Sequence, residues 1–163
     1  MNQTTLLLSK ENFKFSSGHF LIFDDQRAER LHGHNYQVKV EITIPPEKNL
    51  MDQGYFVDFN VFKKYIKDRL DQWDEFVLLP KNHKDMKFRE EGPSLHINFR
   101  DRYYVLPKNE VVLLPVINTS VEQLSRILAE DFYQAFKLYK VTKVLVSVEE
   151  TKGQAAATVA GDF

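Results

Sequence analysis

The sequence of 163 residues contains no cysteine. This absence excludes disulfide bonds, thiolate metal sites and cysteine nucleophiles. A bound metal ion must therefore be held by imidazole or carboxylate groups, and a catalytic base must be His, Asp, Glu, Lys or Tyr. The length favours a single domain that spans residues 1–163.

The chain also lacks an excess of charge and a long apolar run. Its 22 Lys and Arg residues against 23 Asp and Glu residues leave a formal net charge of −1, so no global field favours nucleic acid or an anionic membrane. No apolar run approaches the ~20 residues that span a bilayer. The TLLL stretch near the start is too short for a signal peptide and has no basic flank. We therefore expect no nucleic-acid partner, no membrane partner and, by default, a cytoplasmic location.

Four segments have the pattern of strands. Residues 13–23 are apolar with polar interruptions. Residues 36–44 alternate apolar and polar side chains and end at Pro45 and Pro46, which is typical of a half-buried strand. Residues 141–148 predict a third strand, and residues 155–159 a weaker fourth one.

Two segments have the pattern of amphipathic helices. Residues 58–73 carry apolar side chains at helical spacing, namely Phe59, Phe62, Ile66 and Leu70. A second helix is expected after Thr119 or Ser120, either of which can cap it, with Glu122 in its first turn. Its apolar side chains are Leu124, Ile127, Leu128 and Phe132.

Residues 81–115 separate the two helices and predict an inserted hairpin. RYYVLP and VVLLPV resemble short strands, whereas KNHKDMKFREEG resembles an exposed loop. His83 and His96 lie among charges in this segment, so we interpret them as solvated loop residues. The order strand, strand, helix, insertion, helix, strand, strand favours an α+β layer fold with an antiparallel sheet.

Three histidines are candidate metal ligands. His32 and His34 lie two residues apart at the start of a strand, so their side chains point to the same side. Gly33 adds no side chain between them. His19 ends the preceding strand and can supply a third imidazole if the two strands pair. Three His ligands with one open position are typical of a catalytic zinc site, although surface or hydrogen-bonded histidines are the alternative interpretation.

Carboxylates form a second group of candidates. Glu29 precedes His32 by three residues, Asp74 and Glu75 follow the first helix, and Glu149 and Glu150 precede Thr151 at the end of a strand. Buried carboxylates near zinc can serve as general bases or bind amide groups. The alternative for each is a solvated surface charge.

Several motifs together resemble the 6-pyruvoyl-tetrahydropterin synthase and 6-carboxytetrahydropterin synthase family. They occur in family order: SSGHF at 16–20, LHGHNY at 31–36, GYFVDF at 54–59, LDQWDEFVLLP at 70–80, TSVEQLS at 119–125 and VEET at 148–151. The resemblance implies a tunnelling fold (T-fold), with a four-stranded antiparallel sheet and two helices on one face. It also implies a homo-oligomer, a trimer or two stacked trimers, with active sites between subunits.

The resemblance further implies a pterin substrate, 7,8-dihydroneopterin triphosphate or a close relative, and Zn²⁺ at His19, His32 and His34. Glu150 falls where the family glutamate binds the guanidine-like edge of the pterin. Thr151 is the adjacent match. Glu122 matches the acid of a family motif T-x-E-N, which reads S-V-E-Q here.

The sequence departs from the family pattern at the catalytic positions. Ala28 stands where the synthases usually have a cysteine, and Glu75 stands where an Asp–His pair would place its histidine after Asp74. The type III branch instead has a glutamate just before HGHNY, and Glu29 resembles it. That branch is expected to cleave the side chain and release 6-hydroxymethyl-7,8-dihydropterin. An exposed turn residue is the alternative for Glu29.

Three functions therefore remain open from the sequence. The first is a zinc-dependent pterin lyase of type III with Glu29 as the base. The second is a 6-carboxy- or 6-pyruvoyl-tetrahydropterin synthase, against which the missing cysteine argues. The third is a non-catalytic pterin-binding paralogue. Lys14, Arg27 and Arg30 lie near the presumed site and are candidates to meet a triphosphate, with solvated surface as the alternative.

Overall fold

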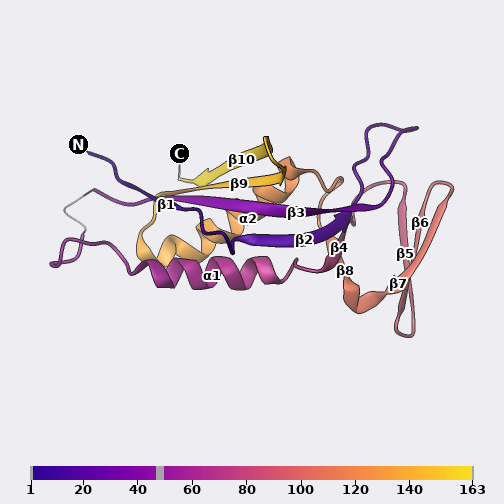
Figure 1. Cartoon of the computed structure of the whole chain (residues 1–163), viewed down its shortest axis with the longest axis horizontal. Coiled ribbons are helices and arrows are strands. Elements are labelled where there is room, and N and C mark those ends of the chain that lie inside the picture. Colours follow the sequence, from indigo (N-terminus) through magenta and orange to yellow (C-terminus); the bar gives the residue numbers. More distant parts are fainter. Residues whose placement is uncertain (1, 47–49, 163) are drawn as a thin grey trace.

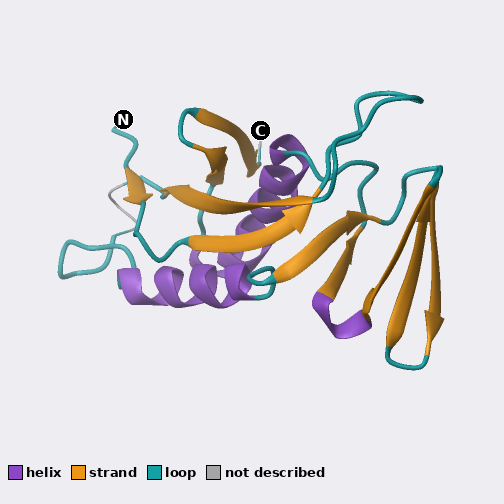
Figure 2. Cartoon of the chain, turned by 45° about the vertical axis from the view of Figure 1, so that its right-hand side comes forward, coloured by secondary structure: helices purple, strands orange, loops and turns teal. Residues whose placement is uncertain are grey.

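The computed structural model describes residues 2–46 and 50–162. A large sheet forms one layer, and helices α1 (Phe59–Asp71) and α2 (Val121–Phe136) cover one of its faces (Figure 1). A separate three-stranded sheet stands beside one end of this layer (Figure 2). The expected α+β class, with the two helices on one face of a sheet, is confirmed.

Among the described residues the large sheet has seven strands, not the four expected. Its order is β10-β9-β3-β2-β4-β8, and β1 also pairs with β3. The four expected strands are β2, β3, β9 and β10, and they are adjacent and antiparallel. The strands of the large sheet are β1 (Thr5–Leu8), β2 (Lys14–His19), β3 (His32–Thr43), β4 (Phe76–Pro80), β8 (Val111–Leu114), β9 (Lys143–Thr151) and β10 (Gln154–Gly161).

The expectation of a purely antiparallel sheet is wrong, because the β2–β4 and β4–β8 pairs are parallel. Strands β1, β4 and β8 have four, five and four residues. Apolar runs this short have no readable period. Their assignment to the sheet depends on partners that lie far away in the sequence.

Alternation along β3 separates the core from the surface. Tyr36, Val38, Val40 and Ile42 are completely buried, whereas Lys39 and Glu41 between them are exposed. The buried side chains pack against both helices in one core. Each fully buried aliphatic side chain of this kind stabilises the fold by roughly 1.5–3 kcal/mol relative to an exposed one.

Both helices start close to the predicted residues, the first from its apolar spacing and the second from its capping candidates. Asp58 caps α1, and its side chain accepts a hydrogen bond of 2.8 Å from the N–H of Asn60. Of the two candidates for α2, Ser120 is the cap and accepts from the N–H of Gln123 at 3.3 Å. Capping by these side chains satisfies N–H groups that have no partner within the helix.

The segment 81–115 is more than the expected hairpin. Strands β5 (Met86–Glu91), β6 (Ser94–Phe99) and β7 (Arg102–Pro107) form a three-stranded antiparallel sheet, called the small sheet below. The polar stretch that was expected to be a loop contributes β5, and β8 leaves the insertion to join the large sheet. The inner face of the small sheet forms a second core with Phe20, Ile22 and Leu79.

His83 and His96 are not solvated loop residues, contrary to expectation. His83 is half-buried, its Nδ1 accepts the N–H of Asp85 at 3.1 Å, and burial lowers its pKa. His96 lies on β6, where its Nδ1 makes a hydrogen bond with the hydroxyl of Tyr103. Both side chains therefore have partners within the insertion and lie outside the main site.

Candidate metal and catalytic site

The pairing of β2 with β3 brings the three candidate histidines together. His19 lies directly opposite His32, and Ser17 opposite His34. The strand alternation places all three imidazoles on the core face, with His34 one step and the His19–His32 pair two steps beyond the stacked rings of Phe15 and Tyr36. The ring centroids are 4.7 to 5.1 Å apart. The site is thus the continuation of the hydrophobic core into polar side chains.

The hydrogen bonds of these rings direct nitrogen lone pairs toward a common point. His19 Nδ1 donates to the carbonyl of Thr119 at 2.8 Å, and His32 Nδ1 donates to the carbonyl of Arg30 at 2.6 Å. The Nε2 atoms of His32 and His34 are 3.0 Å apart. One ring nitrogen from each histidine lies within 4.8 Å of the others. A backbone carbonyl bound to the second ring nitrogen is the usual support for a metal-ligating histidine.

His19 gives a direct test of whether the site fits a metal. Its side chain is 2% exposed, and its Nε2 makes no hydrogen bond with any described residue. Burial lowers its pKa to about 4, so the ring is neutral at physiological pH. A metal ligand must be a neutral imidazole, and a buried lone pair without a partner is costly unless an ion occupies it. The three histidines therefore fit a metal ion.

Glu29 lies beside the cluster, on the loop of residues 20–31 between β2 and β3, called the Glu29 loop below. Its Oε1 is 3.9 Å from His32 Nε2. The same oxygen accepts the N–H of Leu21 at 2.9 Å, and the N–H of Glu29 donates to the carbonyl of Leu21 at 2.8 Å. The carboxylate is therefore held in place, and it is not a freely solvated turn residue.

Glu150 approaches the cluster from β9. Val144, Val146 and Val148 of this strand are fully buried, and alternation puts Glu150 next on the same face. Its Oε2 is 3.8 Å from His34 Nε2. Glu149 points to the other face, where its Oε2 accepts the N–H of Gly153 at 3.3 Å. The site is thus flanked by one carboxylate from the Glu29 loop and one from β9.

The other sequence candidates lie further from the histidine nitrogens. Asp74 Oδ1 accepts the N–H of Ser16 at 2.8 Å, and the N–H of Glu75 donates to the carbonyl of Ser16 at 2.7 Å. Glu75 has a left-handed φ of 63° and lines a hollow of about 370 Å³ that His34 also reaches. Thr151 is exposed at the β9–β10 turn and donates to Gln154 Oε1 at 3.0 Å.

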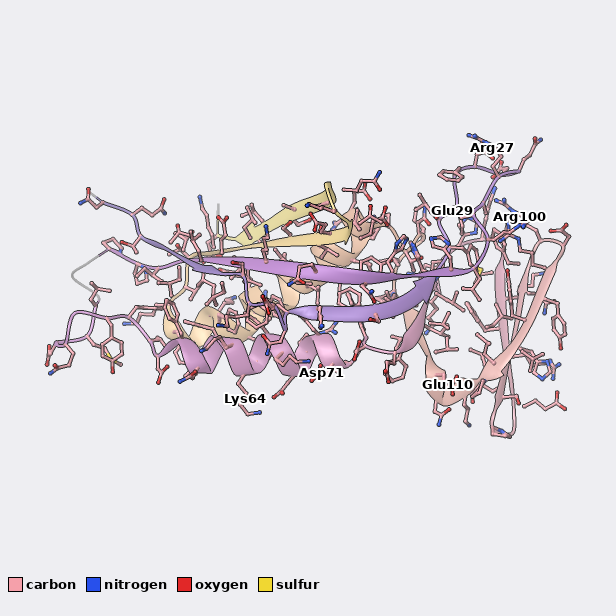
Figure 3. All side chains as sticks on the ribbon, viewed as in Figure 1. Arg27, Glu29, Lys64, Asp71, Arg100 and Glu110 are labelled. Atoms are coloured by element: carbon pink, nitrogen blue, oxygen red, sulfur yellow. The ribbon has the colours of Figure 1, made fainter. Side chains whose placement is uncertain are left out.

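Glu122 and the three basic candidates are all exposed. Glu122 lies in the first turn of α2. Arg27 pairs with Asp24 at 2.8 Å at the outer tip of the Glu29 loop (Figure 3), and Lys14 and Arg30 point to solvent. The contacts of these side chains with the described residues give no evidence that they bind a phosphate.

Tyr36 is a site residue that the sequence reasoning missed. Its ring centroid is 5.5 Å from that of His34, and its hydroxyl is buried without a hydrogen-bond partner among the described residues. Burial and the charge of Glu150 raise its pKa. The signal was available in the sequence, because Tyr36 shares the even-numbered face of β3 with both histidines.

Comparison with known proteins identifies the family. The sequence profile described as 6-pyruvoyl tetrahydropterin synthase matches residues 8–160. A Methanocaldococcus jannaschii protein named "Putative 6-carboxy-5,6,7,8-tetrahydropterin synthase" is 29% identical over 146 residues, which cover 88% of this chain and 87% of that protein. A Pyrococcus abyssi protein of the same name is 33% identical over 118 residues, covering 72% and 68% of the two chains.

Solved structures agree with this result. The crystal structure of 6-pyruvoyl tetrahydropterin synthase from Plasmodium vivax superposes with a TM-score of 0.88 at 25% identity and covers 99% of this chain and 100% of that one. The Plasmodium falciparum synthase has a TM-score of 0.87 at 23% identity, with 98% and 99% covered, and shows the same fold.

These findings place the chain in a class of α+β lyase-type enzymes with the T-fold. The chain belongs to the 6-pyruvoyl tetrahydropterin synthase family. Among the described residues, no helix has the length and apolar character needed to cross a bilayer.

We expect the purified protein to hold about one metal ion per chain, since three histidines make one site with an open position. His32→Ala and His34→Ala should each lose most of this metal in elemental analysis. His96→Ala, which alters a histidine on the small sheet, is the matched control and should keep it. Full metal occupancy in both of the first two variants would contradict the site.

Proposed function

We propose that this protein is a zinc-dependent lyase that acts on 7,8-dihydroneopterin triphosphate and releases 6-hydroxymethyl-7,8-dihydropterin. The observation that carries the proposal is the Glu29 carboxylate, fixed 3.9 Å from His32 Nε2 in a chain that has no cysteine. Ala28 occupies the position of the usual cysteine, so the adjacent glutamate is the ionisable group available to act as a base there.

Zinc is the metal that this donor set favours. Imidazole nitrogen is a ligand that suits Zn²⁺, and three such ligands leave a fourth tetrahedral position open. When bound there, zinc would polarise the hydroxyl oxygens of the substrate side chain and lower their pKa toward neutrality. His19 needs no deprotonation before it binds the metal, because burial keeps its ring neutral.

Glu29 then has a defined proton-transfer role. Its carboxylate accepts the proton of the second side-chain hydroxyl, and that oxygen forms a carbonyl as the bond between the first and second side-chain carbons breaks. The electron pair of this bond passes to the first carbon and is delocalised into the adjacent ring imine. A proton returned to the first carbon leaves a hydroxymethyl group on the pterin, and the other two carbons depart as an aldehyde with the triphosphate. Glu75 is the rival base, because its hollow also reaches His34.

Glu150 is the proposed anchor for the pterin ring. A carboxylate can accept two parallel N–H bonds from the guanidine-like edge of a pterin. Glu150 is half-buried and close to His34. A pterin ring bound to Glu150 would therefore place the side chain of the pterin at the metal site. Thr151 and Glu122 remain candidates to bind the substrate, and Asp74 supports the site through the backbone of Ser16.

A second candidate function comes from the relatives, whose names specify 6-carboxy-5,6,7,8-tetrahydropterin synthase. The missing cysteine favours the first function over this one, and chromatography of the product separates the two. Absence of any turnover would favour a pterin-binding paralogue.

The proposed activity predicts a large effect of Glu29→Ala. The variant should lose on the order of 10²–10⁴-fold in rate with dihydroneopterin triphosphate, which is the usual contribution of a general base, and should retain its metal. Glu75→Ala is the comparison in the same assay and should lose much less. The proposal fails if Glu29→Ala is fully active, or if the wild-type product keeps all three side-chain carbons.

Glu150→Gln tests the pterin anchor separately from the chemistry. The substitution keeps the shape of the side chain but replaces one acceptor by a donor. Pterin binding should weaken by roughly 1.5–3 kcal/mol, the range for a hydrogen bond to a charged group. Glu149→Gln, on the opposite face of β9, is the matched control. Equal pterin affinity of the two variants in titration calorimetry would exclude Glu150 as the anchor.

We also propose a homo-oligomer, a trimer or hexamer. The large sheet ends at β10 on one side and β8 on the other. End strands offer unpaired backbone groups, and closing several sheets into a ring pairs them. Light scattering should therefore report three or six subunits, whereas a stable monomer at micromolar concentration would contradict the assembly.

A further inference from the structure

The small sheet is docked on the root of the Glu29 loop. Leu95, Ile97 and Phe99 on its inner face pack with Phe20 and Ile22, which open the loop. Ala28, at the other end of the loop, packs against the same core. The insertion therefore contacts the loop on both of its arms.

Arg102 makes the most specific of these contacts. It is the first residue of β7, and its guanidinium lies 5.4 Å from the ring centroid of Phe20 and 5.5 Å from that of Phe99. Its Nη1 donates to the carbonyl of Glu29 at 2.6 Å, and its Nη2 donates to the carbonyl of Ala28 at 3.1 Å. Two donors of one rigid, planar group thus hold two successive carbonyls.

Arg100 contacts the same loop in a different place. Its Nη2 donates to the carbonyl of Asp24 at 2.6 Å, and its Nε pairs with Asp85 at 2.9 Å. Figure 3 shows Arg100 beside the loop and Glu29 nearer to the end of β3. Arg100 therefore secures the outer part of the loop, five residues from Glu29, and makes a natural control.

Glu29 is consequently restrained on every polar group it has. Its N–H and carboxylate engage Leu21, and its carbonyl engages Arg102. The bridge between Ile22 and Ala28 comprises this Glu29–Leu21 bond and a bond of 3.0 Å from the N–H of Phe23 to the carbonyl of Arg27. Asn118 binds the backbone of Ile22 on the first arm of the loop, whereas Arg102 binds the second arm, which carries Glu29. If the Arg102 bonds are lost, the peptide after Glu29 can rotate and the carboxylate can leave its place beside His32.

We infer that Arg102 is a positioning residue, through which the inserted sheet holds Glu29 in reach of the metal site. This inference rests on the proposed function for its catalytic consequence, since Glu29 is the base there. The arrangement itself can be tested without turnover. A base acts well only when its geometry is fixed to within a fraction of an ångström.

The first test is amide hydrogen exchange of the metal-loaded protein, read by NMR at Leu21 and Glu29. Arg102→Met removes the donors but keeps the apolar stem, so both amides should exchange on the order of tenfold faster or more. Arg102→Lys keeps the charge without the planar fork and should lie in between. Arg100→Met should leave both amides protected. Metal content should be unchanged in all three variants.

The second test is steady-state kinetics in a double-mutant cycle. Arg102→Met should lower kcat about tenfold or more with little change in KM, because the substrate still binds. Combined with Glu29→Ala it should cause no further loss, since Arg102 acts through Glu29. A general structural role would instead make the two losses multiply and would also lower the melting temperature and the metal content.

Each outcome decides between the two proposals. Wild-type exchange at Leu21 and Glu29 in Arg102→Met would overturn the positioning role, whatever the activity. Faster exchange in a protein whose wild type has no turnover would uphold the positioning of Glu29 and overturn the lyase function. Multiplying losses in the double mutant would also overturn the inference.

Discussion

The register of β2 against β3 is the constraint on which the site depends. His19 faces His32 because Phe15 faces Tyr36 four residues away along the same pair, and these two rings stack at 4.7 Å. A slip of one residue would turn every side chain of one strand to the opposite face. The free energy of burying the aromatic pair therefore maintains the position of the histidines. The same strand register therefore determines both the packing of the core and the geometry of the site.

The site also shows how polar groups are tolerated at the end of a core. His19 is buried, and its Nδ1 bond to Thr119 offsets part of the cost of removing the ring from water. Its Nε2 has no partner among the described residues, so the metal-free fold retains an unsatisfied buried atom. An ion bound there would remove that penalty and would link metal affinity to folding stability.

The inserted sheet extends this support to the connecting loop. The loop that carries Glu29, the proposed base, is restrained by the small sheet through apolar packing and the paired hydrogen bonds of Arg102. The insertion between the two helices thus helps to fix the position of Glu29 near His32. On its outer face His96 and Tyr103 contact each other.

Local patterns in the sequence determined the main secondary-structure elements and the side on which two of the histidines lie. The period of β3, the start of α2 after one of two capping candidates, and the common face of His32 and His34 follow from neighbours within a few residues, and the structure agrees with each. The tertiary structure alone decided the rest. The parallel pairing of β4 and β8, the bond of His19 to Thr119 and the bonds of Arg102 to Glu29 join residues that are far apart in sequence. Such contacts depend on how the chain packs, and no periodicity along it records them.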